Sequence, residues 1–177
     1  DAAGKVLSTF GNDGWSSALT ALAVVDLDGS GRPVAACGTN KNNLYALTAS
    51  AGKLAQRWKA SIGDVVTCLA AARLDGTPKE QVVVGSASDY VYVLDGAGAI
   101  LWRANLHEVV QAVWAGDLDG DGRDEVVAVT DRAVVILDTG GRVIASHTTA
   151  SPIRAFAGGQ RLLVGCEDGQ VLALRLR

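Results

Sequence analysis

The chain has 177 residues, a formal net charge of −3 and a hydrophobic content of 49%. This length and apolar content can bury a full core, which excludes a disordered chain. The charge balance, without a basic stripe, argues against nucleic acid as a partner. No apolar run reaches the length of a membrane span, so no spanning segment is predicted.

One unit is repeated about four times along the chain. Its plainest copies are the apolar segments 43–47, 90–94, 133–137 and 170–174. Their first residues are 47, 43 and 37 positions apart, a spacing typical of four-stranded propeller blades. The repeat therefore predicts a circular array of similar sheets.

Each unit is predicted to contain four strands, because apolar and β-branched runs alternate with Gly, Asp and Asn clusters. The first strands are Ala-rich and cover 19–27, 66–74, 110–118 and 153–157, and the second cover 34–37, 81–84, 125–129 and 161–164. The third strands are the four repeat copies. The fourth strands follow turns at Gly52, Gly98 and Gly141, and the fourth unit ends without one. Residues 5–10, after Gly4, have the sequence of this missing strand.

The predicted fold class is all-β: a β-propeller with four four-stranded blades, in which the N-terminal strand 5–10 completes a terminal blade. Apolar residues at nearly every strand position indicate that both faces of each sheet are covered, as in blades packed side by side. The predicted blades, in a single array over 1–177, cover about 18–60, 65–104, 109–148 and 153–177 plus 5–10.

Three ways of satisfying the terminal blades remain open. One chain could close as a four-bladed monomer, or two chains could exchange terminal strands and form an eight-bladed homodimer. The chain could also be a piece of a longer propeller, with its open edges covered by further blades.

Two features resemble known propeller families. The sequence Leu-Asp-Gly-Ala-Gly-Ala-Ile-Leu-Trp over 94–102 resembles quinoprotein (PQQ-like) repeats, in which the Trp docks between neighbouring blades. This resemblance implies docking by Trp102 and by its counterpart Trp58, whereas Ala145 and Ser8 stand at the third and fourth positions. The family's cofactor residues have no identifiable counterparts.

The loop 117–125, Asp-Leu-Asp-Gly-Asp-Gly-Arg-Asp-Glu, has the chemistry of a Ca²⁺ site. Carboxylates at alternate positions, followed by one more acid, can supply several of the six to eight oxygens that Ca²⁺ takes. The loop resembles the calcium loop of FG-GAP/VCBS repeats, the blades of integrin-type propellers. The resemblance implies a structural Ca²⁺ held by Asp117, Asp119, Asp121, the carbonyl of Arg123, and Glu125. It leaves Asp124 outside the pattern, facing solvent.

The equivalent loops have lost this pattern to different degrees. The loop 26–34 keeps Asp26 and Asp28 but has Val34 at the last position. The loop 73–81 has Arg73 in place of the first acid, and this guanidinium is expected to pair with Asp75. The fourth unit has only 158–160. One metal site is therefore expected.

The sequence contains no recognisable catalytic constellation, so the chain is predicted not to be an enzyme. Binding is expected at the end of the propeller that carries the loops between second and third strands and between blades. The ligand-face candidates there are Trp15, Lys41, Asn43, Asp89, Tyr90, His107 and Arg132. Their partner is expected to be a protein or a polar ligand.

The leading function hypothesis is a non-catalytic interaction scaffold with a structural Ca²⁺ loop. The alternatives are an extracellular adhesion or carbohydrate-binding module and a fragment of a quinoprotein-like enzyme. The compartment stays open, because a calcium loop favours an extracellular or periplasmic location while three cysteines, expected to be free, favour the cytoplasm.

Overall fold

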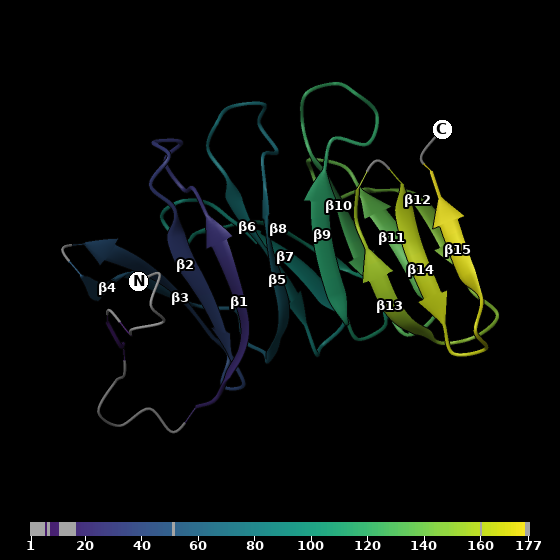
Figure 1. Ribbon diagram of the computed structural model, residues 1–177, viewed down its shortest axis with the longest axis horizontal. Helices are drawn as coiled ribbons and strands as arrows, with labels where there is room; N and C mark the ends of the chain where they lie inside the picture. The colour runs from purple at the N-terminus through teal and green to yellow at the C-terminus, as the bar shows by residue number, and fades with distance from the viewer. Residues whose placement is uncertain (1–5, 7, 11–16, 51, 160, 176–177) are drawn as a thin grey trace.

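A computed structural model describes residues 6, 8–10, 17–50, 52–159 and 161–175, and all regular elements in these residues are β-strands (Figure 1). The all-β prediction is therefore confirmed. The described residues contain no helical segment that could span a membrane.

The strands form four antiparallel sheets in chain order. The first sheet contains β1 (Leu19–Val25), β2 (Val34–Thr39), β3 (Asn43–Ser50) and β4 (Lys53–Ser61). The second contains β5 (Val66–Ala72), β6 (Gln81–Ser86), β7 (Tyr90–Leu94) and β8 (Ile100–Asn105). The third contains β9 (Ala112–Gly116), β10 (Glu125–Val129), β11 (Ala133–Leu137) and β12 (Val143–Thr148), and the fourth contains β13 (Ile153–Ala157), β14 (Leu162–Cys166) and β15 (Val171–Leu174). These sheets are the predicted propeller blades.

The hydrophobic core is divided into layers between successive sheets. One layer lies between the first and second sheets, the next between the second and third, and another between the third and fourth. Because strand residues alternate between the two faces, an inner sheet contributes to two layers: Val82 and Val84 pack on the first sheet, and Val83 on the third. This two-sided burial explains the continuous apolar runs of the central strands.

Tryptophans join neighbouring blades, as the quinoprotein resemblance implied. The indole N–H of Trp58 on β4 donates to the carbonyl of Gly96 in the second sheet's turn, with an N···O distance of 3.0 Å. Trp102 on β8 makes the same contact with Thr139 of the third sheet, at 2.9 Å. Both rings pack on turn glycines, Gly98 and Gly141, where a Cβ atom would be 3.0 Å or less from the indole.

The N-terminal segment 5–10 was predicted to complete a terminal blade. Its described residues, Val6 and 8–10, are not in a strand, and two of them, Ser8 and Phe10, contact the first sheet. The backbone N–H of Leu54 on β4 donates to the hydroxyl of Ser8 at 3.0 Å, and Phe10 packs against a cluster on the outward face of that sheet. The fourth sheet therefore has three strands among the described residues.

The loops gather at two opposite ends of the blades. Figure 1 shows the long loops after β1, β5 and β9 projecting from the upper edge of the array. Since neighbouring strands are antiparallel, the turns between second and third strands and the loops between blades lie at the other end. The calcium-type loop and the predicted ligand face are thus on opposite ends, as expected.

Candidate metal centre

The loop between β9 and β10 is shaped by its own aspartates. The carboxylate of Asp117 accepts hydrogen bonds from the backbone N–H groups of Gly120 and Gly122, at 2.6 and 3.0 Å. The carboxylate of Asp119 accepts one from Asp121, at 3.0 Å. The two glycines have φ values of 87° and 86°, a conformation that costs glycine little. These bonds bend the loop so that its acidic side chains turn toward its base.

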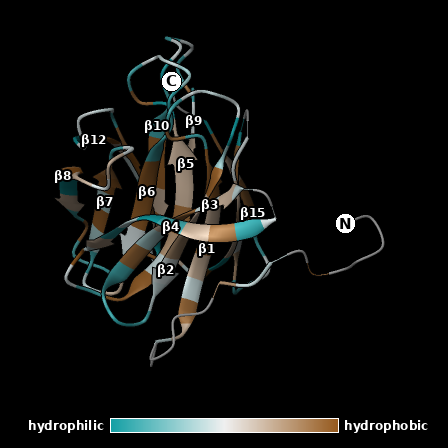
Figure 2. Ribbon diagram, turned by 90° about the vertical axis from the view of Figure 1, so that its left-hand side faces the viewer, coloured by the Kyte–Doolittle hydropathy of each residue, from teal (hydrophilic) through white to brown (hydrophobic). Residues whose placement is uncertain are grey.

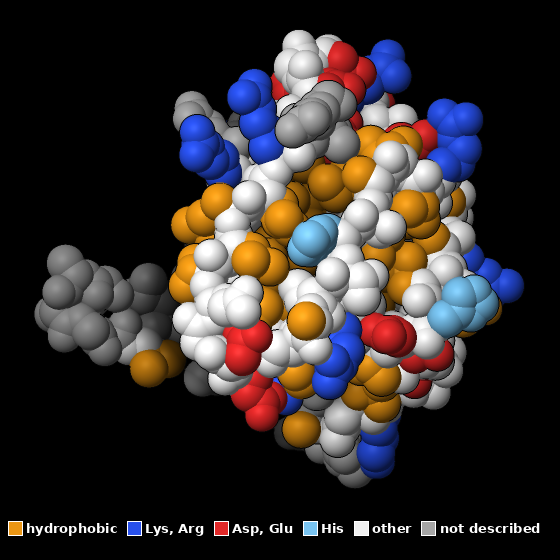
Figure 3. Space-filling view, turned by 90° about the vertical axis from the view of Figure 1, so that its right-hand side faces the viewer, with side chains coloured by type: hydrophobic (Ala, Val, Ile, Leu, Met, Phe, Trp, Pro, Cys, Tyr) orange, Lys and Arg blue, Asp and Glu red, His pale blue; other side chains and the backbone are white. Residues whose placement is uncertain are grey.

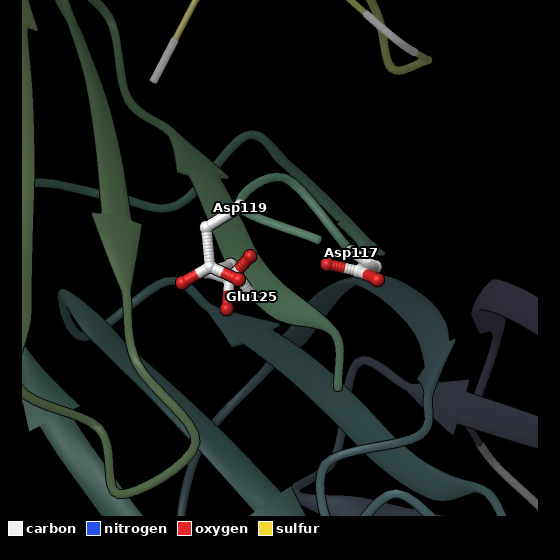
Figure 4. Close-up of side chains that lie close together, drawn as sticks. All are labelled: Asp117, Asp119 and Glu125. Carbon is white, nitrogen blue, oxygen red and sulfur yellow. The ribbon is translucent and has the colours of Figure 1, made fainter. Parts of the chain in front are cut away.

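Three carboxylates meet at that base. One oxygen from each of Asp117, Asp119 and Glu125 lies within 4.8 Å of the other two. Figure 4 shows the three side chains there, with those of Asp119 and Glu125 next to each other. Because Ca²⁺–oxygen distances are about 2.3–2.6 Å, two ligands on opposite sides of one ion are roughly 5 Å apart. The three oxygens therefore fit around a single Ca²⁺.

Glu125 is the buried member of the cluster. It is 4% exposed, whereas Asp117 and Asp119 are exposed. Burial, followed by the charges of the loop aspartates, raises the pKa of Glu125, although a hydrogen bond from the N–H of Leu118 opposes this shift. A buried carboxylate facing other carboxylates favours either a proton or a cation.

Of the four predicted carboxylate ligands, Asp121 is not part of the cluster; the fifth predicted ligand, the carbonyl of Arg123, stays a prediction. The carboxylate of Asp121 accepts a hydrogen bond from the backbone N–H of Arg123, at 2.8 Å, and does not belong to the group of converging oxygens. The side chain of Arg123 extends toward Gly76 in the neighbouring loop. The structure thus brings together three of the predicted side chains.

A cavity of about 470 Å³ adjoins the cluster. Asp117 and Asp119 line one side, and Arg161 and Arg175 also line it. The cavity leaves room for water beside the carboxylates. Water molecules are common ligands of Ca²⁺ where the protein supplies fewer than six oxygens.

The loop between β1 and β2 has the same backbone frame without the last acid. Asp26 accepts hydrogen bonds from Ser30 and Gly31, much as Asp117 does in the third blade. Val34 is buried where Glu125 stands in the third blade. Hydrogen bonds from Ser30 hold the pKa of Asp28 below its ordinary value, so this aspartate stays charged. The first loop lacks the buried carboxylate of the cluster.

Two acidic residues join neighbouring loops, and one of them, Asp124, corrects a prediction. Asp124, expected to face solvent, is 7% exposed, and its carboxylate accepts a hydrogen bond from the backbone N–H of Arg73 at 2.7 Å. Glu80 bonds to the N–H of Asp26 at 2.7 Å in the same way. In each pair the backbone also returns a hydrogen bond. We call these two contacts the loop clasps.

Arg73 also pairs with a different residue from the one predicted. Its guanidinium lies 3.9 Å from the carboxylate of Asp124, while Asp75 accepts hydrogen bonds from Thr77 within its own loop. Sequence reasoning missed these contacts because they join different blades. A signal was present: Glu80 and Asp124 both stand immediately before the second strand of their blade.

The predicted ligand-face residues occupy turns at the opposite end. Lys41 lies between β2 and β3, Asp89 between β6 and β7, His107 between β8 and β9, and Arg132 between β10 and β11. Asn43 and Tyr90 begin the third strands next to these turns. Trp15 lies outside the described residues. The candidates are therefore spread over three blades.

Contacts already hold part of this end in place. The guanidinium of Arg103 lies 5.4 Å from the ring centre of Tyr90, and Arg132 donates to the carbonyl of Ala150 at 2.6 Å. Arg154 on β13 pairs with Asp131 and with Glu167. This end offers a polar surface with both signs of charge.

Known structures resemble this chain in fold. No protein-family model and no curated protein matches the sequence. The crystal structure of the computationally designed Ika4 protein matches at 20% identity with a TM-score of 0.73, over 98% of this chain and 99% of that one. BamB from Moraxella catarrhalis matches at 20% identity with a TM-score of 0.68, over 97% of this chain and 50% of that one. BBS1N, in a crystal structure with ARL6DN, matches at 15% identity with a TM-score of 0.69, over 90% of this chain and 52% of that one.

These likenesses establish the architecture. The neighbours are propellers, and BamB is a PQQ-like propeller, so the chain has a β-propeller fold of four blades. The chain spans nearly all of Ika4 but only about half the length of BamB and BBS1N. At 15–20% identity the resemblance concerns fold and does not extend to ligands.

Proposed function

We propose that this chain is a non-catalytic propeller scaffold whose third blade is stabilised by a structural Ca²⁺ ion. The observation that supports the ion is the convergence of Asp117, Asp119 and Glu125 within 4.8 Å. The family resemblance adds Asp121 and the carbonyl of Arg123 to the ligand set. These oxygens are the hard ligands that Ca²⁺ prefers.

The ion would act on the stability of the blade. Without it, the acidic groups repel each other at the base of the loop, where Glu125 is shielded from water. Ca²⁺ bound to the folded loop neutralises this repulsion and stabilises the folded state by mass action. The ion is proposed as a clip between β9 and β10, because only this loop has the complete acid pattern.

Thermal unfolding with and without Ca²⁺ tests the proposed ion. At a Ca²⁺ concentration 100 times the dissociation constant, binding adds about 2.7 kcal/mol to the free energy of unfolding. For a chain of this size we expect the melting temperature to rise by roughly 5–10 °C. Asp119→Ala should abolish the rise. Asp28→Ala, the matched change in the first blade, should leave it intact.

Two results would count against the ion. Equal melting temperatures in Ca²⁺ and in chelator would remove it from the proposal. A Ca²⁺ response that survives Asp119→Ala but is lost in Asp28→Ala would move the site to the first blade. Isothermal titration of both variants with CaCl₂ provides a second, direct measurement.

The scaffold role is proposed on two grounds. The two histidines lie in different blades, His107 in the turn after β8 and His147 on β12, so they do not form a shared acid–base site. The propeller BBS1N is found in a complex with another protein, which illustrates the use of this fold for interaction. We also propose that the scaffold is a homodimer, and that its loop end binds a protein or a polar ligand.

A further inference from the structure

The fourth sheet has one covered face and one open apolar face. Phe156, Val164 and Leu172 pack against the third sheet. The alternate residues point the other way, and they are all apolar or glycine: Ala155, Ala157, Leu163, Gly165, Val171 and Ala173. Val171 is 74% exposed and Leu163 is 44% exposed. Figure 3, which looks at this end of the molecule, shows hydrophobic side chains across it.

The first sheet also has an open apolar face, on the side away from the second sheet. Figure 2 looks at this end of the molecule. Leu22 and Val24 of β1 are 64% and 65% exposed on this face. Leu22 pairs with Cys37, just as Leu69 pairs with Val84 in the second sheet. Leu69 and Val84 are packed against the preceding blade. The open face of the first sheet is thus the face that a preceding blade covers elsewhere in the array.

The N-terminal segment already lies where the outer strand of a preceding blade would lie. Ser8 follows Gly4 by four residues, as Trp102 follows Gly98. Trp102 docks at the outer turn of the next blade, and Ser8 contacts Leu54 beside the outer turn of the first sheet. Phe10, two residues on, packs on the same face of that sheet.

The side chain of Ser8 is smaller than the tryptophan side chains at the equivalent positions, and it leaves the turn glycine of the first sheet uncovered. Gly98 and Gly141 are covered by tryptophan rings from the preceding blade. At the equivalent Gly52, no described atom lies within 4 Å of a Cβ placed on it. The first sheet therefore keeps an open receiving surface.

The fourth sheet has a matching open edge. Among the described strands, β15 pairs with β14 and has no partner on its other side. A cavity of about 390 Å³ lies beside this edge, lined by Leu174 of β15 and by Val134, Ile136 and Ile144 of the third sheet, and also by the polar residues Ser146, His147 and Arg175. An unpaired strand edge beside a cavity is a place where another strand can add to a sheet.

We propose that a second copy of this chain covers both open faces, through a joint shared between copies. In this joint the fourth sheet of one copy docks on the first sheet of the other, and β15 pairs with the other copy's residues 8–10. The joint repeats the packing found between consecutive blades within the chain. Two such joints close a ring of eight blades. This inference rests on the proposed homodimer and specifies how it forms.

A second copy is favoured over closure within one chain because the two open faces are far apart. Figure 1 shows the first and fourth sheets at opposite ends of the long axis of the array. Bringing them together in one molecule would require each layer between blades to repack at a steeper angle. A second copy covers both faces while the three existing core layers stay as they are.

The repeat predicts the register of the joint. Trp102 pairs with Val93, and Ala145 pairs with Ile136. By the same alignment, Ser8 stands opposite Ala173 of the other copy. Directly opposed residues in antiparallel strands have Cα atoms about 4.5–5.5 Å apart, within the range that a disulfide bridges.

The mass in solution, measured by light scattering, tests the assembly. We expect the mass of two chains for the unsubstituted protein at tens of micromolar. Val171→Asp and Val24→Asp should each give the mass of one folded chain, because each places a carboxylate in the joint. Leu101→Asp, at a 53% exposed position on β8, should remain a dimer. The mass of one chain for the unsubstituted protein would overturn both the joint and the homodimer.

Oxidative cross-linking tests the joint itself. The double variant Ser8→Cys with Ala173→Cys should form a disulfide-linked species of two chains, and Thr9→Cys with Ala173→Cys should not, because in the proposed added strand residue 9 would point to the opposite face from residue 8. The unsubstituted protein measures any background from its own cysteines. A two-chain mass without this cross-link would overturn the joint and leave the homodimer standing. A cross-link within single chains would show closure within one molecule and overturn the proposal.

Discussion

Gln81 and Glu125 occupy the same position in neighbouring blades and accept the same hydrogen bond. The side-chain oxygen of Gln81 accepts from the backbone N–H of Leu74 at 2.9 Å, and that of Glu125 accepts from Leu118 at 2.8 Å. Gln81 is neutral, whereas Glu125 faces two aspartates. The second blade therefore shows how this contact can be kept without a charge.

Glu125→Gln should separate the structural contact from the binding of an ion. The amide retains the hydrogen bond and removes the repulsion, so the melting temperature in chelator should rise by about 2–4 °C for each kcal/mol of repulsion relieved. The Ca²⁺-dependent rise should disappear. The reverse change, Gln81→Glu, should lower the melting temperature. A lower melting temperature for Glu125→Gln in chelator would show that the charge of Glu125 does not destabilise the calcium-free protein.

In the calcium-free protein, the contribution of Glu125 to stability should be lost as the pH rises through its raised pKa. Burial and neighbouring carboxylates raise the pKa of Glu125 in the folded chain, so the folded state holds this proton more tightly than the unfolded state. The contribution of Glu125 to the free energy of unfolding is complete below the ordinary pKa of about 4.5, and it is lost as the pH rises through the raised pKa of the folded chain. Urea unfolding in calcium-depleted buffer over this window measures the loss. If wild type and Glu125→Gln change in parallel, Glu125 is not the cause.

The loop clasp of Asp124 should stabilise the protein independently of Ca²⁺. Asp124→Ala leaves the N–H of Arg73 without its carboxylate partner in a half-buried position, which we expect to cost about 1–3 kcal/mol in urea unfolding. The response to Ca²⁺ should remain, because this carboxylate is not in the cluster. Asp75→Ala, an exposed change whose contacts stay within one loop, should cost less. Loss of Ca²⁺ binding in Asp124→Ala would place it among the ligands.

The tryptophan joints can be tested at the glycines that receive them. Gly141 and Gly52 have φ values of 81° and 74°, so alanine should cost about 1–2 kcal/mol at either position. At Gly141 the new Cβ would also lie 2.6 Å from the ring of Trp102, whereas the space at Gly52 is open. Gly141→Ala should therefore cost roughly 1–3 kcal/mol more in chemical unfolding. Equal losses would show that the indole contact is loose.

Much of the fold could be predicted because the signals are local and repeated. Strand runs, turn glycines and a period near 40 residues recur from blade to blade, and two-sided burial leaves the apolar runs unbroken. The docking of Trp58 and Trp102 was implied by the resemblance to quinoprotein repeats, and the structure has it. The acidic loop could be recognised for the same reason, since its acidic residues lie within nine consecutive positions.

Contacts between blades were harder to predict. Asp124 stands next to a predicted ligand in the sequence, yet it bonds to Arg73, 51 positions away. Arg73 and Asp75 are separated by one residue, but their partners lie in different loops. Sequence spacing does not encode which loops touch, because that depends on the angle between sheets.

The number of blades, the order of strands in each and the position of the acidic loop can be predicted from the amino-acid sequence alone. These depend on strand periodicity and turn chemistry, which act over a few residues. Three features are visible only in the folded chain: Glu125 is buried among aspartates, Asp124 joins two loops, and the first and fourth sheets keep apolar faces at opposite ends. These features depend on how whole sheets pack, and packing is settled by surfaces that are distant in the chain.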